Sequence, residues 1–135
     1  MDAKIQWNAD MLFQGASEDG HAVMMDSSEK HGGKNSAPRP KELILQGLGG
    51  CTGMDVISIL KKMRNLPEKF RMEIHADQTD EHPRIFKNIH IKYYFSGELD
   101  REKVARAVEL SQKQYCGVSE MLRRSSDLTH EIIYE

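Results

Sequence analysis

The segment PKELILQGLGGCTGMDVISILKKM, from Pro40 to Met63, decides the fold because it is the longest apolar stretch of the chain. Read as a helix, it leaves almost no polar stripe, and such a helix belongs inside a fold or in a subunit interface. Glycines stand at 47, 49, 50 and 53, and each costs a helix about 1 kcal/mol relative to alanine. We therefore expect a close neighbour, another backbone or a small ligand, against the face that lacks side chains.

Cys51 lies near the middle of this predicted helix. Three-, four- and seven-residue spacing places it on one face with Leu48, Met54, Asp55 and Ser58. We expect a thiol that is largely buried, with Asp55 and Ser58 as polar groups at its edge. Because free cysteine often packs as a small hydrophobe, the helix alone is compatible with a structural thiol as well as a reactive one.

Length and composition are typical of one soluble domain. The chain has 135 residues, 30% of them charged, and a formal net charge of −2, which does not favour nucleic acid as a partner. We predict a single domain over residues 1–135, with N-terminal strands in 1–26, a loop in 27–39 and a core in 40–135. The apolar segment is shorter than the ~20 uninterrupted apolar residues of a membrane span, and no signal-peptide core follows Met1. We expect a cytoplasmic protein that binds no membrane.

The two cysteines, Cys51 and Cys116, lie 65 positions apart (116 − 51). In a reducing cytosol a permanent disulfide between them is unusual, so the pair is either incidental or redox-active. The six histidines are scattered, and no CxxC, HxxxH or HExxH spacing occurs. Local sequence therefore predicts no metal site, whereas one assembled from distant residues stays open.

The N-terminal part reads as three short strands, over residues 4–8, 11–16 and 21–26, with a hairpin turn at Glu18-Asp19-Gly20. Residues 27–39 have no hydrophobic period and many turn formers. Such a loop is typical of a lid or crossover arm, and equally of a disordered linker.

After the long helix, strict alternation over 70–77 and 85–95 predicts two half-buried antiparallel strands with one wet face. His75 and His90 fall on the wet face. Asp100 is a good N-cap for a second helix that would align Val104, Val108, Ser111 and Tyr115 on one side. A short helical turn at 120–124 and an edge strand over 128–134 complete an α+β chain.

Cys116 falls at the junction between the second helix and the turn that follows. Free backbone N–H groups and the helix dipole at such a position favour a thiolate over a thiol.

The order of elements, with a cysteine inside the central helix and another at the end of the second helix, resembles the OsmC/Ohr family of osmotically inducible and organic-hydroperoxide-resistance proteins. The residues that carry the resemblance are Pro40-Lys41-Glu42-Leu43, Gly49-Gly50-Cys51 and Cys116-Gly117-Val118-Ser119. It covers nearly the whole chain and is closest to the less characterised OsmC-like branch, with GLGGCTGMDV around the first cysteine.

The resemblance implies an α+β fold, an intertwined homodimer with sites at the subunit interface, and thiol-dependent reduction of organic hydroperoxides. It implies that Cys51 attacks the peroxide and becomes a sulfenic acid, and that Cys116 condenses with it to a disulfide. An external dithiol would then reduce that disulfide, with no bound cofactor. A sulfenic acid needs a second thiol nearby to avoid over-oxidation, which agrees with this assignment.

Three positions depart from the pattern of the better-known peroxidases. Lys41 stands where they have glutamate and Glu42 matches the next position, residues 1–38 contain no arginine, and Gly117 follows Cys116 where proline is usual. These departures favour an alternative, a non-enzymatic dimeric module that binds a small apolar ligand. A zinc site built from the two cysteines and histidines is a third hypothesis.

Spacing limits which charges can serve Cys51. Lys41 and Glu42 precede it by ten and nine residues, roughly 14–15 Å along one helix, so they cannot touch their own Cys51. Activation from that helix start would need a partner chain. The candidate cations are Arg39, Lys41, Arg123 and Arg124, and Glu42 and Asp55 are the candidate acids.

Overall fold

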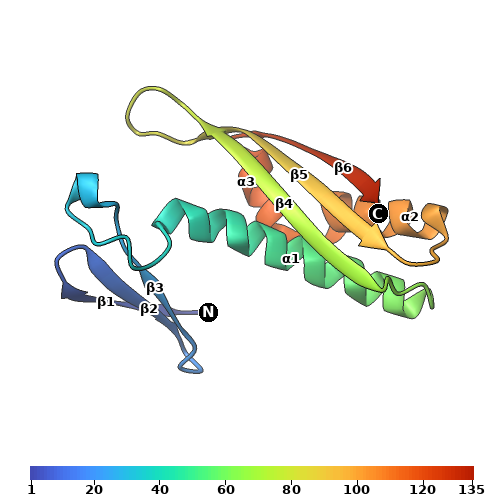
Figure 1. Ribbon diagram of the computed structural model, residues 1–135, viewed down its shortest axis with the longest axis horizontal. Coiled ribbons are helices and arrows are strands. Elements are labelled where there is room, and N and C mark those ends of the chain that lie inside the picture. The colour runs from blue at the N-terminus through green and yellow to red at the C-terminus, as the bar shows by residue number, and fades with distance from the viewer. The chain divides into compact units, whose positions relative to one another are not determined.

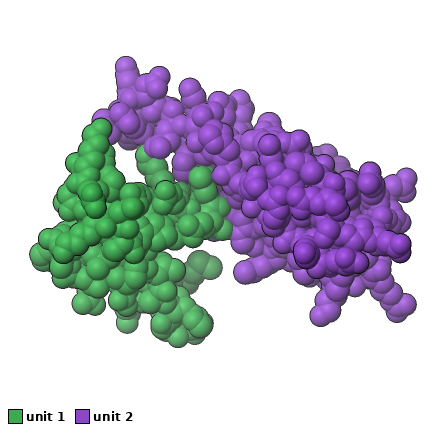
Figure 2. Space-filling model, viewed as in Figure 1, with its two compact units in different colours: residues 1–46 green, residues 47–135 purple.

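The computed structural model describes all residues, 1–135, and its elements fall into two compact units, Met1–Gln46 and Gly47–Glu135 (Figures 1 and 2). The boundary lies inside the helix α1 (Pro40–Lys62), so the two units share that helix. The sequence-based division at residues 26 and 39 stays a prediction.

The first unit holds an antiparallel sheet of the strands β1 (Ala3–Ala9), β2 (Leu12–Ser17) and β3 (Ala22–Met25). The three predicted strands are therefore confirmed, and Gly20, at φ 83°, makes the turn between β2 and β3. Ile5 pairs with Gly15 and Trp7 with Phe13, so apolar side chains gather on one face. Ile5, Trp7 and Val23 on this sheet are more than half exposed.

The segment after β3 is an ordered loop around a buried carboxylate, which argues against the disordered linker. Asp26 is 4% exposed and accepts hydrogen bonds from the backbone N–H groups of Ser27, Lys34 and Ser36 and from the Ser36 hydroxyl. A short 3₁₀ turn, η1 (Glu29–His31), lies inside the loop. These bonds lower the pKa of Asp26 from 3.8 to about 2, the Ser36 hydroxyl contributing most.

The second unit is a three-stranded sheet with its helices on one face (Figure 1). The strands β4 (Lys69–Gln78) and β5 (Phe86–Ser96) are antiparallel, as predicted, and β6 (Asp127–Tyr134) is an edge strand that runs parallel to β5. The second helix, α2 (Arg101–Leu110), begins after its N-cap Asp100, which accepts from the N–H groups of Glu102 and Lys103. A π-helical turn, η2 (Ser111–Tyr115), and α3 (Gly117–Arg123) follow.

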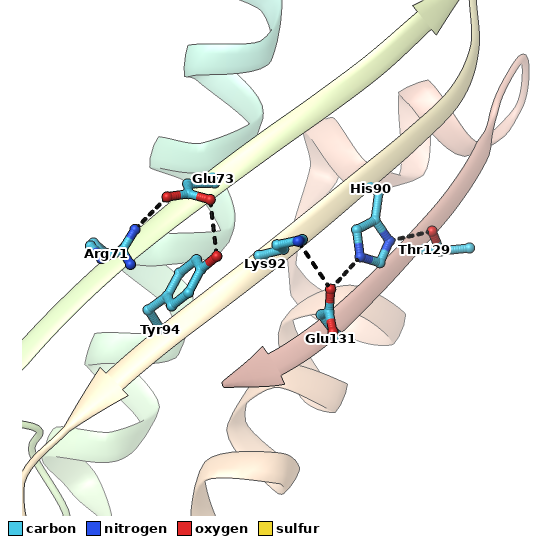
Figure 3. Close-up of polar contacts among 7 residues, drawn as sticks. All are labelled: Arg71, Glu73, His90, Lys92, Tyr94, Thr129 and Glu131. Atoms are coloured by element: carbon cyan, nitrogen blue, oxygen red, sulfur yellow. Dashed lines mark hydrogen bonds and ion pairs between the residues drawn. The ribbon is translucent and has the colours of Figure 1, made fainter. Parts of the chain in front are cut away.

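The outer face of this sheet is polar and carries the side chains that alternation assigned to it. Tyr94 donates to Glu73 at 2.9 Å, beside the Arg71–Glu73 ion pair, and His90 lies between Thr129 and Glu131 (Figure 3). Surface ion pairs of this kind contribute little to stability individually. His90 is thus held by sheet neighbours, and His75 lies near Asp77 on the same face. We assign this face a structural role.

The core lies between the sheet and the helices. Its fully buried apolar side chains come from α1, β5 and α2: Leu48, Val56, Leu60, Ile89, Ile91, Tyr93, Phe95, Val104 and Val108. By length and composition α1 alone could cross a membrane, but its buried side chains make it the core helix of the second unit. Gly49 and Gly53 allow α1 to approach β4, because a Cβ at Gly53 would lie 2.8 Å from the Met72 methyl group.

One side-chain assignment from the sequence is wrong. Tyr115 was placed with Val104 and Val108 on the buried side of the second helix, but it is 55% exposed. The π-helical turn inserts one extra residue, which rotates the following side chain by about 100° around the helix axis. The N–H of Cys116 consequently bonds to the carbonyl of Ser111, at 2.8 Å.

Candidate functional site

Both cysteines meet in the second unit, together with an acid. The Sγ atoms of Cys51 and Cys116 and a carboxylate oxygen of Asp55 all lie within 4.8 Å of one another. Asp55 reaches the site because it stands one helical turn after Cys51 on α1. Cys116 reaches the site as the residue that directly follows the π-helical turn η2. Both thiols are free.

The two thiols differ in access. Cys116 is 3% exposed, whereas Cys51 is only partly buried. Cys116 is the N-cap of α3, and its sulfur accepts the N–H of Ser119 at 3.3 Å. Burial nevertheless raises the pKa of Cys116, and the contacts from Ser119 oppose this only in part. The N–H group at the start of α3 lowers the pKa of Cys116, as its helix-terminal position predicts, but desolvation outweighs this effect and the net pKa is raised.

Asp55 is the end of a buried chain of hydroxyl groups. The Ser111 hydroxyl donates to Asp55 Oδ2 at 3.0 Å, and Thr52 Oγ1 lies 2.8 Å from Ser111 Oγ. Thr52 Oγ1 also lies 2.7 Å from the Tyr93 hydroxyl. With Ser111 donating to the carboxylate, its oxygen accepts from Thr52 and the Thr52 oxygen accepts from Tyr93. All three hydroxyl donors then point toward Asp55.

Gln112 and Arg123 fix the far end of this chain. The Gln112 amide donates to the Tyr93 hydroxyl at 2.7 Å and to Thr52 Oγ1 at 3.3 Å. Arg123 donates to the side-chain and backbone oxygens of Gln112, at 3.2 and 3.0 Å, which orients that amide. Burial raises the pKa of Tyr93, so its hydroxyl keeps its proton. The whole set, Thr52, Tyr93, Ser111 and Gln112, holds the Asp55 carboxylate in place.

The predicted cations lie in different surroundings. Arg123 bonds to Gln112 and Glu120, and Arg124 pairs with Glu120 at 3.6 Å. Arg39, in the first unit, donates to Asn35 Oδ1 at 2.6 Å. Glu42 accepts the Arg39 backbone N–H at 2.9 Å and so caps the start of α1. Lys41 stands beside it in the first turn, and a role of these residues at Cys51 stays a prediction.

An apolar groove runs along α1, as the glycines indicated, but neither cysteine lines it. It has a volume of about 660 Å³, and its walls are the glycine row and the side chains around it: Gly49, Gly50, Gly53, Met54, Ile57, Ser58, Lys61, Phe70 and Met72. Met54 is 76% exposed there. The hollow beside Cys116 is smaller, about 260 Å³, and is lined mostly by polar residues of η2 and α3.

Sequence reasoning missed the residues that hold the site together. Thr52 and Tyr93 are separated by 41 positions and Thr52 and Ser111 by 59, so no local motif connects them. Tyr93 lies on the buried face of β5, within the stretch 85–95 that alternation predicted as a half-buried strand. One sequence feature could have pointed to the hydroxyl chain, namely a tyrosine and a threonine at core positions, because buried hydroxyl groups require hydrogen-bond partners.

Comparison with known proteins agrees with this architecture. A model of the OsmC-like protein family matches residues 33–131. Protein YhfA of Escherichia coli (strain K12) is 37% identical over 131 residues, which cover 96% of this chain and 95% of that protein.

Solved structures show the same fold. A hypothetical protein from Aquifex aeolicus VF5 has 26% identity and a TM-score of 0.82, with 99% of this chain and 96% of that one covered. The organic hydroperoxide resistance protein OhrB of Bacillus subtilis has 17% identity and a TM-score of 0.69, with 98% of each chain covered. The α+β fold expected from the resemblance is confirmed. On the family match and the extent of the likeness to YhfA, this chain belongs to the OsmC-like protein family.

Proposed function

We propose that this protein is a thiol-dependent peroxidase that reduces organic hydroperoxides through Cys51 and Cys116. The observation that carries the proposal is the approach of the two sulfurs, within 4.8 Å, with one thiol accessible and the other buried. A disulfide has an S–S distance of about 2.05 Å, so a modest rotation of the two side chains joins them.

The difference in access supports separate roles for the two thiols. Cys51, the more exposed thiol, attacks the terminal oxygen of the hydroperoxide as a thiolate, so the O–O bond breaks and the alkoxide leaves as an alcohol after taking a proton. The product is the Cys51 sulfenic acid. Cys116 then attacks that sulfur, a disulfide forms, and water leaves. An external dithiol supplies the two electrons that regenerate both thiols.

Asp55 is the group that moves the proton. Its carboxylate lies within 4.8 Å of both sulfurs and is held by Ser111, so it can take the thiol proton and return it to the leaving alkoxide. A carboxylate does not stabilise a resting thiolate, because like charges repel. A cation from Arg39 or Lys41 of a second copy of the chain would supply that stabilisation.

Two exposed apolar surfaces support a homodimer. The sheet β1–β3 exposes Ile5, Trp7 and Val23, and the groove along α1 exposes Met54. Exposed apolar patches of this kind mark association surfaces. We propose that a second copy of the chain covers both, and that the protein works in the cytoplasm, where its two thiols stay reduced.

The test is consumption of cumene hydroperoxide in the presence of a dithiol. We expect Cys51→Ser to abolish turnover and Cys116→Ser to stop after one sulfenic acid per chain, trapped with dimedone. Asp55→Asn should lower kcat, whereas Asp77→Asn, on the outer sheet face, is the matched control and should leave it unchanged. Equal rates for Cys51→Ser and the parent would remove Cys51 as the nucleophile.

The glycine-lined groove favours a second candidate function, a module that binds a small apolar ligand. In that case the cysteines are ordinary side chains. Mass spectrometry after mild peroxide treatment separates the two functions, because the peroxidase forms a Cys51–Cys116 disulfide and the binding module retains two unmodified thiols.

A further inference from the structure

We infer that the reduced protein binds one Zn²⁺ ion, or a similar borderline-soft divalent cation, through the side chains of Cys51, Asp55 and Cys116. Two sulfurs and one carboxylate oxygen within 4.8 Å of one another form a donor set from α1 and the start of α3. This inference does not depend on peroxidase activity.

The geometry of the three donors fits a tetrahedral ion with little movement. Zn–S bonds of about 2.3 Å and Zn–O bonds of about 2.1 Å place neighbouring tetrahedral ligands roughly 3.5–3.8 Å apart. The donors lie within 4.8 Å of one another, so each pair needs to close by about 1.3 Å at most. Side-chain rotation of the partly exposed Cys51 supplies such a movement without any change in the helices.

The type of donor selects the metal. Calcium and magnesium prefer sites made of oxygen atoms, whereas thiolates favour zinc and other softer ions. Three protein ligands leave a fourth tetrahedral position open, as in catalytic zinc sites. Because Cys51 is partly exposed, water or a small thiol can enter that position.

The surroundings of the site favour a positive charge. The cations on the neighbouring turns are engaged elsewhere, Lys113 with Glu109 at 2.8 Å and Arg123 with Gln112 and Glu120. Coordination of a divalent ion requires thiolates and releases their protons, so the ion itself would supply the positive charge at this site.

Two of the three ligands already accept hydrogen bonds from neighbouring groups. Ser111 donates to Asp55 and so orients the carboxylate, and the Ser119 N–H donates to the Cys116 sulfur. The Ser119 hydroxyl is fully buried and has no hydrogen-bond partner. A Cys116 thiolate bound to a metal is the acceptor that this hydroxyl lacks.

The test is anaerobic titration of the fully reduced protein with Co²⁺ as a spectroscopic substitute, followed by displacement with Zn²⁺. We expect one equivalent per chain, a visible band typical of tetrahedral Co²⁺, and a near-ultraviolet charge-transfer band from the thiolates. Oxidation to the disulfide removes both sulfur ligands, so binding should disappear and return after reduction.

Variants assign the ligands. Cys51→Ser should weaken Zn²⁺ binding by more than about 100-fold, and Ser111→Ala, which acts through Asp55, by about 10-fold. Asp77→Asn is the control, because it removes an exposed carboxylate beside His75 without touching the site. Circular dichroism verifies the fold of each variant. The inference is overturned if the Co²⁺ spectrum lacks the thiolate band, or if Cys51→Ser binds Zn²⁺ as tightly as Asp77→Asn, which would indicate an adventitious ion only.

Discussion

The hydroxyl chain that ends at Asp55 predicts a measurable coupling between Thr52 and Tyr93. Thr52 is fully buried, and its Oγ1 lies 2.7 Å from the Tyr93 hydroxyl, 2.8 Å from Ser111 and 3.3 Å from the Gln112 amide. Thr52→Val replaces the hydroxyl by a methyl group of similar size. It therefore removes hydrogen bonds and leaves no large cavity.

The size of the effect follows from counting the partners that remain. After Thr52→Val, Ser111 still donates to Asp55 and the Tyr93 hydroxyl still accepts from Gln112, but the Tyr93 proton loses its acceptor. Losing the two short bonds at about 0.5–1.5 kcal/mol each gives roughly 1–3 kcal/mol. Tyr93→Phe also removes two bonds and should cost a similar amount. The shared bond should appear as a coupling free energy of about 1 kcal/mol.

Urea unfolding of the two single variants and the double variant measures this coupling as a double-mutant cycle. Tyr94→Phe is the matched control, because Tyr94 follows Tyr93 on β5 but donates to Glu73 on the exposed face. Its cost should stay below about 0.5 kcal/mol. The chain of hydroxyls is refuted if the coupling is below about 0.3 kcal/mol, or if Tyr94→Phe is as destabilising as Tyr93→Phe.

Three further predictions test the loop, the glycine row and the dimer. Because Asp26 has a lowered pKa, its contribution to stability is present above about pH 4 and is lost as the pH falls toward 2. In urea unfolding, Asp26→Asn should therefore lose less free energy of unfolding over that pH range than the parent. Equal pH dependence of the two free energies would contradict this. A Cβ at Gly50 meets nothing within 4 Å, so helix propensity alone predicts that Gly50→Ala stabilises the chain by about 0.8–1 kcal/mol. If a partner copy packs against Gly50, the same substitution should weaken self-association in analytical ultracentrifugation. Unchanged association would argue against a partner copy at this position. Trp7, the only tryptophan, is 62% exposed in the single chain. If a dimer covers it, acrylamide quenching of its fluorescence should fall as the protein concentration rises. Constant quenching would indicate that no second copy covers Trp7.

The elements of this fold were predictable because their signals are local. Alternation over two stretches gave β4 and β5 to within a residue or two, and Asp100 marked the start of α2. The long apolar helix was predicted from Pro40, and it begins there. A period of two or of 3.6 residues depends only on near neighbours, so it can be read without knowing the tertiary contacts.

The site was predictable only in its cysteines and Asp55. The hydroxyl chain joins α1, β5 and η2, and its members become neighbours only when the helices pack on the sheet. The π-helical turn also escaped prediction, because a single inserted residue leaves the hydrophobic pattern of α2 unchanged until Tyr115. Asp26 reads as an ordinary loop acid, although it anchors the backbone at Ser27, Lys34 and Ser36.

The peroxidase and the zinc site use the same three side chains. The two functions differ in whether Cys116 carries its proton. In the first step of peroxide reduction Cys51 reacts as a thiolate while burial raises the pKa of Cys116 and keeps its proton; Cys116 loses that proton only when it attacks the sulfenic acid. A bound Zn²⁺ ion removes that proton and occupies both sulfurs, so the loaded protein has no free nucleophile. Zinc should therefore inhibit peroxide consumption, and a chelator should restore it. Asp55→Asn should weaken the inhibition by zinc while leaving the fold largely unchanged. If zinc binds without inhibiting, the ion lies elsewhere on the protein.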